Sequence, residues 1–380
     1  MKKLLFATCC IAFLSGSLGA AAQKKSVAKN VLTQTLNGKS WSADNGNGTF
    51  TNPLFYDEFS DPDIIRVGED YYLAGTTMHS VPGLVVLHSK DLVNWEFSSY
   101  CFDRFDDSDD FNLRNGKEAY GQGIWAPAIR YHNGMFYIFS NINGHGLQVY
   151  ISDSAKGPWT HHKVNGDIYD LSVLFDENGK IYAVHKYGNV TVTELKPDLS
   201  GPVEGSSKVV IPEGNAMGEG HHVYKINGMY YILSADYSPM GRMQCARSKS
   251  IWGPYETCVI SERESYGYAA GWSVGNMGIG RPLPEDGFSF QNNKPNGLNL
   301  GCATIHQGGV SMQDFNAVGR TVCLSPITWV DGWPYFGLEK NLGRSPRTWF
   351  KPNDMVKTPQ APYDRCDDFS GKTFKPVWQW

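Results

Sequence analysis

A hairpin unit that recurs along the chain constrains the fold more than any other feature of the sequence. Each copy is a turn ending in Gly, or in Gly plus an acid, that is followed by an aromatic strand. The copies are residues 67–73, 132–138, 177–183 and 226–232. Their tip glycines lie 66, 45 and 49 residues apart, and the polar insertion 103–117 stretches the first interval. Asn-Gly tips tolerate positive φ and the flanking residues favour strands, so each copy predicts a β-hairpin.

A second marker, a turn closed by an aromatic ring, follows three of the hairpins at 89–95, 152–159 and 248–255. Four-stranded units that recur every ~40 to 50 residues are typical of propeller blades, which cannot bury their faces alone. The 41 glycines and 20 tyrosines, with only 19% charged residues, agree with many short strands and tight turns. We therefore predict an all-β protein with a β-propeller over 50–345. A two-sheet sandwich, the competing all-β architecture, would not explain the repeated unit.

The regular spacing of the hairpins ends after the fourth copy. The next match lies in 329–337, and its tip glycine comes 104 residues after Gly228. The Gly- and Asn-rich run 264–301 occupies the interval in which a fifth blade should lie. The pattern therefore indicates an irregular fifth blade.

The beginning of the chain predicts export. Residues 1–22 have a basic start, a short apolar core and small residues at the end, which is typical of a secretory signal peptide. Residues 23–49 are polar and predict a lead-in with little structure. Nothing later resembles a membrane span of about 20 apolar residues, and a net charge of −4 gives no reason to expect a nucleic acid partner. We expect a periplasmic or extracellular protein with no transmembrane segment.

Six cysteines follow the predicted signal peptide: Cys101, Cys245, Cys258, Cys302, Cys323 and Cys366. Their spacing has no CxxC character and fits no zinc pattern. Buried free thiols are the favoured interpretation, and an even number in an exported protein also allows one or two disulfides.

Three acids interrupt or precede the first strands of the predicted hairpins. Asp61 stands seven residues before Gly68, and Asp170 and Glu219 each stand nine residues before their tip glycines. Acids that begin the inner strands of a propeller point at its central cavity and become neighbours there. A single Asp-Pro would indicate a turn, and most acids are solvated rim residues. Three acids at matching positions favour a functional site instead.

Proline geometry separates two carboxylates in the first of these strands. Asp61 precedes Pro62, which predicts an extended backbone at Asp61. On an extended segment Asp63 should point the other way, so we predict that Asp63 is structural.

Motifs spread over residues 50–345 resemble, in order, those of glycoside hydrolase family 43. They are 59–68, 89–95, 124–127, Asp170 with its apolar strand, 218–221 and 331–334. The resemblance implies a five-bladed propeller that hydrolyses β-xylosides or α-L-arabinofuranosides with inversion. The implied partners are hemicellulose oligosaccharides such as arabinoxylan and xylo-oligosaccharides.

The resemblance also implies a role for each acid. Asp61 would be the general base, Glu219 the general acid, and Asp170 the residue that tunes and orients the acid. An inverting glycosidase needs a carboxylate and a carboxylic acid about 6.5 to 9.5 Å apart, with water between the base and the sugar. The negative charge of Asp170 would favour the protonated form of Glu219.

Four further residues are candidates by motif position. Trp125 would form an apolar wall for a sugar ring, although a strand Trp is core at least as often. Arg320 resembles the family arginine that donates to sugar hydroxyls, and His79 stands where relatives often have an aromatic platform. His306 resembles a histidine lining the central channel, where many relatives hold calcium. No cofactor is required by this chemistry, and a structural calcium is compatible with it.

Two departures from the family pattern concern the end of the chain. Only 14 positions separate His306 from Arg320, where relatives usually place a strand hairpin. We therefore predict that the fifth blade is incomplete. Residues 346–380 form a tail that resembles the first strand of a β-sandwich domain and then stops. The shortened fifth blade leaves open a propeller that binds hemicellulose oligosaccharides without turnover. A further alternative is an intact-propeller interaction protein with no sugar site, which requires the three acids to be dispersed.

Overall fold

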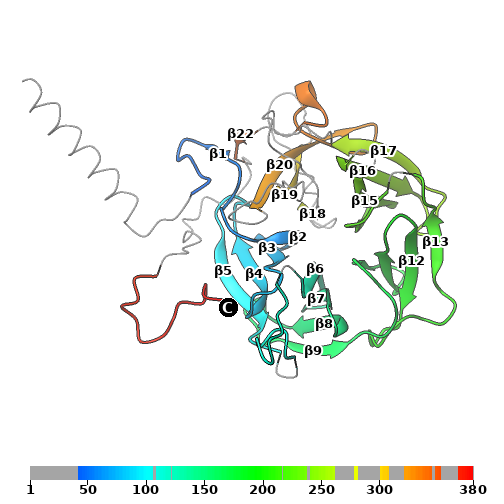
Figure 1. The fold of residues 1–380 in the computed structure, drawn as a ribbon. Coiled ribbons are helices and arrows are strands. Elements are labelled where there is room, and N and C mark those ends of the chain that lie inside the picture. The colour runs from blue at the N-terminus through cyan, green and yellow to red at the C-terminus, as the bar shows by residue number, and fades with distance from the viewer. Residues whose placement is uncertain are drawn as a thin grey trace, which may run out of the picture. The chain divides into compact units, whose positions relative to one another are not determined.

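The computed structural model describes residues 42–105, 108–120, 122–215, 217–237, 240–261, 278–280, 300–307, 321–344, 347–351 and 367–379 (Figure 1). For 278–280 and 300–307 only the backbone is described. The chain divides into two units, 42–363 with 376–380 and 1–41 with 364–375. The predicted signal peptide therefore lies outside the described residues. Of the second unit, residues 367–375 contain bends and no strand or helix.

The larger unit is built from four-stranded antiparallel sheets whose strands follow chain order, five of them within the described residues. The first sheet contains β2 (Ser60–Val67), β3 (Asp70–Thr76), β4 (Gly83–Ser89) and β5 (Glu96–Phe102). The second contains β6 (Ile124–His132), β7 (Met135–Ile142), β8 (Gly146–Ser152) and β9 (Thr160–Lys163), and the third contains β10 (Ser172–Phe175), β11 (Ile181–His185), β12 (Val190–Leu195) and β13 (Lys208–Ile211). The fourth contains β14 (His222–Ile226), β15 (Met229–Tyr237), β16 (Met240–Ser248) and β17 (Glu256–Ser261), and the fifth contains β18 (Gly278–Gly280), β19 (Leu300–Gln307), β20 (Thr321–Val330) and β21 (Trp333–Phe336).

The sheets are arranged as the blades of a propeller. Their first strands contact one another around the ring: β2 contacts β6 and β18, and β10 contacts both β6 and β14. The fourth strands β5, β9, β13 and β17 lie at the outside (Figure 1). Because the first strands of a propeller all begin at the same end of the ring, residues at these starts are brought together. The predicted all-β propeller is confirmed.

The repeated hairpins identified in the sequence are the connections between the first and second strands of the first four blades. Their register places each Gly at the turn, as in the pairing of His132 with Met135 and of Ile226 with Met229. The later match at 329–337 is the β20–β21 hairpin, which joins a third strand to a fourth. This difference in blade position explains why the sequence rhythm fails there.

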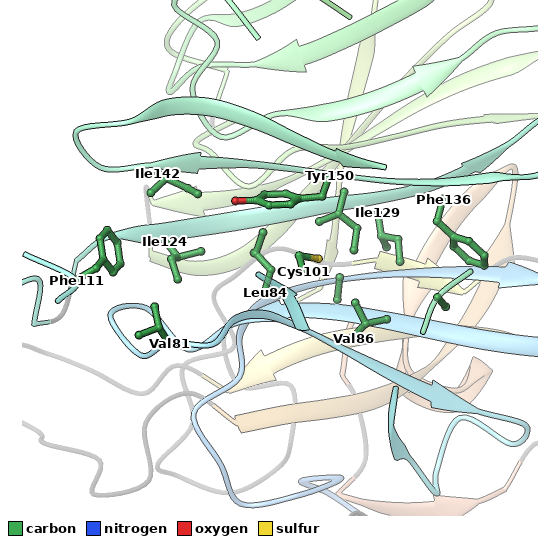
Figure 2. Packing of buried hydrophobic residues seen from close by; sticks show 13 residues of the cluster. Val81, Leu84, Val86, Cys101, Phe111, Ile124, Ile129, Phe136, Ile142 and Tyr150 are labelled. Atoms are coloured by element: carbon green, nitrogen blue, oxygen red, sulfur yellow. The ribbon is translucent and has the colours of Figure 1, made fainter. Parts of the chain in front are cut away.

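Apolar layers between neighbouring blades hold the ring together. Between the first two blades, Leu84 and Val86 of β4 and Cys101 of β5 lie against Ile129 of β6 and Tyr150 of β8 (Figure 2). Corresponding clusters join the second blade to the third, the third to the fourth, and the fourth to the fifth. Full burial of each aliphatic side chain contributes roughly 1.5–3 kcal/mol, so these layers fix the positions of the inner strands.

Segments on either side of the blades help to close the ring. Asn52 is fully buried, donates from Nδ2 to Leu324 O at 2.9 Å, and accepts at Oδ1 from Leu324 N at 2.8 Å. β1 (Thr49–Thr51) pairs with β22 (Thr348–Phe350). Ala43 is also buried, with 2% of its surface exposed. The packed chain thus includes residues on both sides of the predicted boundaries at 50 and 345.

The incomplete fifth blade predicted from the spacing is not shown by the described residues. β18, β19, β20 and β21 form a four-stranded sheet, and β19 pairs with β20 from Leu300 opposite Thr328 to Gln307 opposite Thr321. Residues 281–299 and 308–320 lie outside the described residues.

The described residues contain one short helix and four cysteines with described side chains. The 3₁₀ helix η2 covers Glu339–Asn341, and no helix in the described ranges is long and apolar enough to cross a membrane. Cys101, Cys245, Cys258 and Cys323 are free thiols. Buried free thiols were the favoured prediction, and Cys101, Cys245 and Cys323 agree with it, whereas Cys258 is only partly buried. Cys302 and Cys366 have no described side chains.

Candidate active site

An irregularity in strand pairing occurs where the first strand of each of the first four blades begins. The register of β2 against β3 shifts between Ser60 and Asp63, so that Asp61 and Pro62 together face one residue of β3. The equivalent residues in the second, third and fourth blades are Trp125, Asp170 and Glu219. Bulges of this kind re-aim side chains and are common beside active sites. They place one acid from each of three blades at the same end of the ring.

Backbone angles at two of these positions are unusual. Asp61 has φ 49° and Asp170 has φ 50°, both in the left-handed region. This corrects the expectation that Pro62 holds Asp61 in an extended geometry, because the bulge imposes a different angle. Asp tolerates the left-handed region better than most residues because its short polar side chain can form local bonds. Glu219 does not share this angle.

Asn141, near the end of β7, fixes the segment that carries Asp170. Its Nδ2 donates to Ile168 O at 2.9 Å, and its Oδ1 accepts from Asp170 N at 3.1 Å. Asp170 itself is buried, with 8% of its surface exposed, and its Oδ2 accepts from Gly220 N at 2.6 Å. The acid of the third blade is therefore tied directly to the residue that follows Glu219.

The hydroxyl of Tyr169 is a point on which the three acids converge. It donates to Glu219 Oε2 at 3.0 Å. Burial raises the pKa of Tyr169, and the nearby charges of Glu219, Asp170 and Asp61 raise it further. Electrostatic effects of this kind weaken with distance and with exposure to water. The hydrogen bond places Glu219 on this hydroxyl, and the charges of Asp170 and Asp61 act on it from nearby.

The backbone of Glu219 extends the pairing of β14 with β15. Ala235 N donates to Glu219 O at 2.9 Å, and Gly218 N donates to Ala235 O at 2.7 Å. Ser234 Oγ also donates to Glu219 O, at 3.2 Å. These three bonds hold the segment that carries Glu219 against β15, and a strand is a more rigid support than a loop.

His221 anchors the same segment from its buried side. The ring is 2% exposed, and its Nε2 donates to Lys186 O at 2.6 Å. Burial lowers the pKa of His221 to about 4, against the opposing effect of the Lys186 carbonyl. The ring is therefore neutral at pH 7 and carries its proton on Nε2. Its Nδ1 is buried without a hydrogen-bond partner among the described atoms.

Two of the predicted substrate contacts lie on the first two blades. Trp125 occupies the second-blade position equivalent to the acids, is partly buried, and accepts from Ser140 Oγ at its carbonyl at 2.7 Å. His79, in the loop after β3, lies against Tyr120 with ring centroids 4.7 Å apart. Tyr120 is 73% exposed and precedes β6. By topology both residues belong to the same end of the ring as the acids.

The other two predicted residues are not placed as side chains. Arg320 lies outside the described residues, and only the backbone of His306, in β19, is described. Both stay predictions.

A buried charge cluster, consisting of Asp63, Arg130 and His222, lies further along the inner strands. Asp63 is fully buried and forms an ion pair with Arg130 Nη1. His222 Nδ1 lies 3.1 Å from Asp63 Oδ1 but outside hydrogen-bond geometry. Burial opposes the ionisation of Asp63, yet the neighbouring Arg130 and His222 hold its pKa below the usual range. These contacts agree with the predicted structural role of Asp63.

Arg130 extends this cluster across several blades. Its Nη2 donates to Ser172 Oγ at 2.5 Å, and its Nε donates to Val173 O in the third blade. Ser172 Oγ also accepts from Val223 N of the fourth blade at 3.0 Å. The inner strands that carry the acids are thus cross-linked by one buried polar network.

Calcium would need six to eight oxygen ligands. Within the described ranges, no group of three or more His, Cys, Asp or Glu side chains could hold a metal ion. The Asp63 carboxylate is already paired with Arg130. The calcium predicted beside His306 stays a prediction, because only the backbone of His306 is described.

Tyr169 and Asn141 are the site residues that sequence reasoning missed. Tyr169 directly precedes Asp170 but meets an acid 50 positions later in the chain, and no spacing rule reveals that contact. Asn141 acts from the neighbouring blade. The equivalence of Trp125 to the acids could have been found from sequence, since Trp125 stands nine residues before Gly134, the same offset as for Asp170 and Glu219.

The fold and the acids together define a class of protein: a β-propeller with carboxylates from different blades gathered at one end of its inner strands. A set of carboxylates is what glycosidic bond hydrolysis requires. Residues 50–334 match the family profile of the glycosyl hydrolases family 43, and the chain belongs to this family. The family resemblance of the motifs is thereby confirmed.

Individual relatives support this assignment. The chain is 29% identical to a β-xylosidase of Formosa agariphila over 90% of its own length and 60% of the relative's. It is 33% identical to a non-reducing end α-L-arabinofuranosidase of Bacteroides ovatus over 80% of its length and 56% of the relative's. The crystal structure of the family 43 protein BlXynB of Bacillus licheniformis superposes with a TM-score of 0.69 at 28% identity, covering 87% of this chain and 64% of that one. The chain thus spans about 60% of the length of the curated relative from Formosa agariphila.

Proposed function

We propose that this chain is an exported, inverting glycoside hydrolase that releases terminal α-L-arabinofuranose, β-D-xylose or both from arabinoxylan-type hemicellulose. The observation that carries the proposal is the convergence of Asp61, Asp170 and Glu219, from three different blades, on the Tyr169 hydroxyl. The activities for which the relatives are named, β-xylosidase and α-L-arabinofuranosidase, supply the two pentose substrates. The signal-like residues 1–22 support export.

In the proposed reaction, Asp61 acts as general base and Glu219 as general acid. Asp61 takes a proton from water while the water oxygen bonds to the anomeric carbon. The bond from that carbon to the leaving oxygen breaks, and its electron pair stays on the oxygen, which receives the proton of Glu219. One water is consumed and the anomeric configuration inverts. Asp170, bonded to Gly220 N, orients the segment that carries the acid.

Paired aryl substrates test this proposal. We expect the purified protein to release 4-nitrophenol from a β-D-xyloside, an α-L-arabinofuranoside or both, and NMR to show the inverted anomer as first product. Glu219→Gln removes the transferable proton but keeps the size of the side chain, so its turnover of a methyl pentoside, whose leaving group needs that proton, should fall by about 10²–10⁴-fold. Thermal unfolding of the variant checks that the propeller is intact.

The binding-only alternative gives a different result. A protein that binds xylo-oligosaccharides in calorimetry yet releases no pentose would contradict the proposed hydrolysis. Full activity of Glu219→Gln on the methyl pentoside would remove Glu219 from the proposed mechanism.

A further inference from the structure

The hydrogen bond from Tyr169 gives the two carboxyl oxygens of Glu219 different roles. Tyr169 Oη donates to Oε2 at 3.0 Å, so Oε2 serves as an acceptor in the folded protein. A protonated carboxyl group has a single O–H donor. If Oε2 accepts from Tyr169, the transferable proton belongs on Oε1.

The Tyr169 hydroxyl is well suited to remain a donor. Burial and the surrounding carboxylates raise the pKa of Tyr169, so it keeps its proton throughout the neutral range. The side chain is 43% exposed, so solvent and substrate can reach it.

The backbone around Tyr169 is fixed on both sides. Lys186 N donates to Tyr169 O at 2.9 Å. Asn141 holds the two flanking residues, through Ile168 O at 2.9 Å and Asp170 N at 3.1 Å. A hydroxyl carried on such a support is preorganised and needs little rearrangement during a reaction.

We infer that Tyr169 is a positioning residue for proton donation by Glu219: it reserves Oε2 as an acceptor, directs the acidic proton to Oε1, and stabilises the carboxylate that forms as the proton leaves. This inference rests on the proposed function, in which Glu219 is the acid. A hydrogen bond to an ionised carboxylate is roughly twice as strong as one to a neutral group. The bond from Tyr169 therefore strengthens as Glu219 gives up its proton, which favours the transition state over the bound substrate.

The inference predicts a dependence on the leaving group. Poor leaving groups need full proton transfer, whereas 4-nitrophenolate leaves with little help. Tyr169→Phe should therefore lower kcat on a methyl pentoside by about 10-fold, the typical effect of one hydrogen bond to a charged group. With the 4-nitrophenyl pentoside of the same sugar, the change should stay within about threefold. The alkaline limb of the kcat/KM profile should move to higher pH, because the ionised acid has lost a donor.

Two comparisons make the test decisive. Tyr131→Phe makes the same chemical change at a tyrosine of similar exposure, 40%, on β6, and should behave as the wild type on both substrates. Glu219→Gln reports on the acid itself. Loss of activity in Glu219→Gln together with wild-type behaviour of Tyr169→Phe would overturn this inference alone. Equal losses on both leaving groups with an unmoved pH profile would also overturn it, since they indicate packing only. Full activity of Glu219→Gln on the methyl pentoside would overturn the proposed role of Glu219 as the acid as well.

Discussion

Asp61 and Asp63 lie two residues apart on β2, and their surroundings differ in almost every respect. Asp63 is fully buried, paired with Arg130 and held ionised by that charge. Asp61 is partly exposed, has a left-handed φ, and acts electrostatically on Tyr169 beside the other acids. The bulge between Ser60 and Asp63 separates the two environments. One strand thus carries a carboxylate that stabilises the fold and another that is available for chemistry.

The largest expected effect is on activity at the exposed member of the pair. Asp61→Asn keeps the shape of the side chain and its tolerance of positive φ but cannot take a proton from water. We expect kcat/KM to fall by about 10²–10⁴-fold, measured by pentose release. The free energy of unfolding should change by no more than about 0.5 kcal/mol in urea titrations. A large loss of stability would show that the two carboxylates are not separated in role.

The buried member should respond in the opposite way. Asp63→Asn leaves the Arg130 guanidinium, 12% exposed, without its counter-charge. Breaking a buried pair in this manner typically costs about 3–5 kcal/mol, which urea unfolding would measure directly. Because the folded pKa of Asp63 lies below its unfolded value, the contribution is present above that value and is lost as the pH falls through the folded pKa. A variant as stable as the wild type would contradict the structural role.

His221, two residues after Glu219, adds a pH-dependent prediction about the stability of the site. The pKa of His221 is about 4 in the folded protein, against the ordinary value of 6.5 that applies to the unfolded chain. Between these values the unfolded chain binds a proton that the folded chain does not, so stability falls as the pH drops from 6.5 to 4. The shift corresponds to about 3 kcal/mol.

His221→Gln can still donate to Lys186 O but does not titrate. Its unfolding free energy should therefore vary less between pH 6.5 and 4 than that of the wild type, in urea titrations at several pH values. His162→Gln changes an exposed histidine on β9 and should keep the wild-type slope. Identical slopes for the wild type and His221→Gln would show that His221 is not held neutral.

The smallest effect is expected at the support of Asp170. Asn141→Leu preserves volume but removes the bonds to Ile168 O and Asp170 N. We expect kcat to fall about 10-fold, since small misplacements of catalytic groups can cost up to about 100-fold. Asn143→Leu, at an exposed residue two positions later, serves as the control. An unchanged kcat in Asn141→Leu would show that the segment keeps its geometry without these bonds.

Local and periodic features of this chain were predictable from sequence, and contacts between blades were not. The hairpins at Gly134, Gly179 and Gly228 depend on neighbouring residues, and the acids follow from their offsets to these tips. The left-handed φ of Asp61 depends on pairing with β3, which overrides the local preference set by Pro62. The contact of Tyr169 with Glu219 depends on how two blades pack. Spacing also predicted an incomplete fifth blade, which the four strands β18 to β21 do not show.

The backbone angles at the acids also determine which acid each position can use. Backbone conformation restricts substitutions of Asp61 and Asp170 even before their chemistry is considered, because a left-handed backbone costs most L-residues roughly 1–2 kcal/mol. Glu would supply a carboxylate there only at that cost and with an extra methylene to place. At position 219 the backbone is not left-handed, so this restriction does not apply. An Asp side chain there would instead be one methylene too short to reach Tyr169. The use of two aspartates and one glutamate is therefore encoded in φ as much as in the reaction.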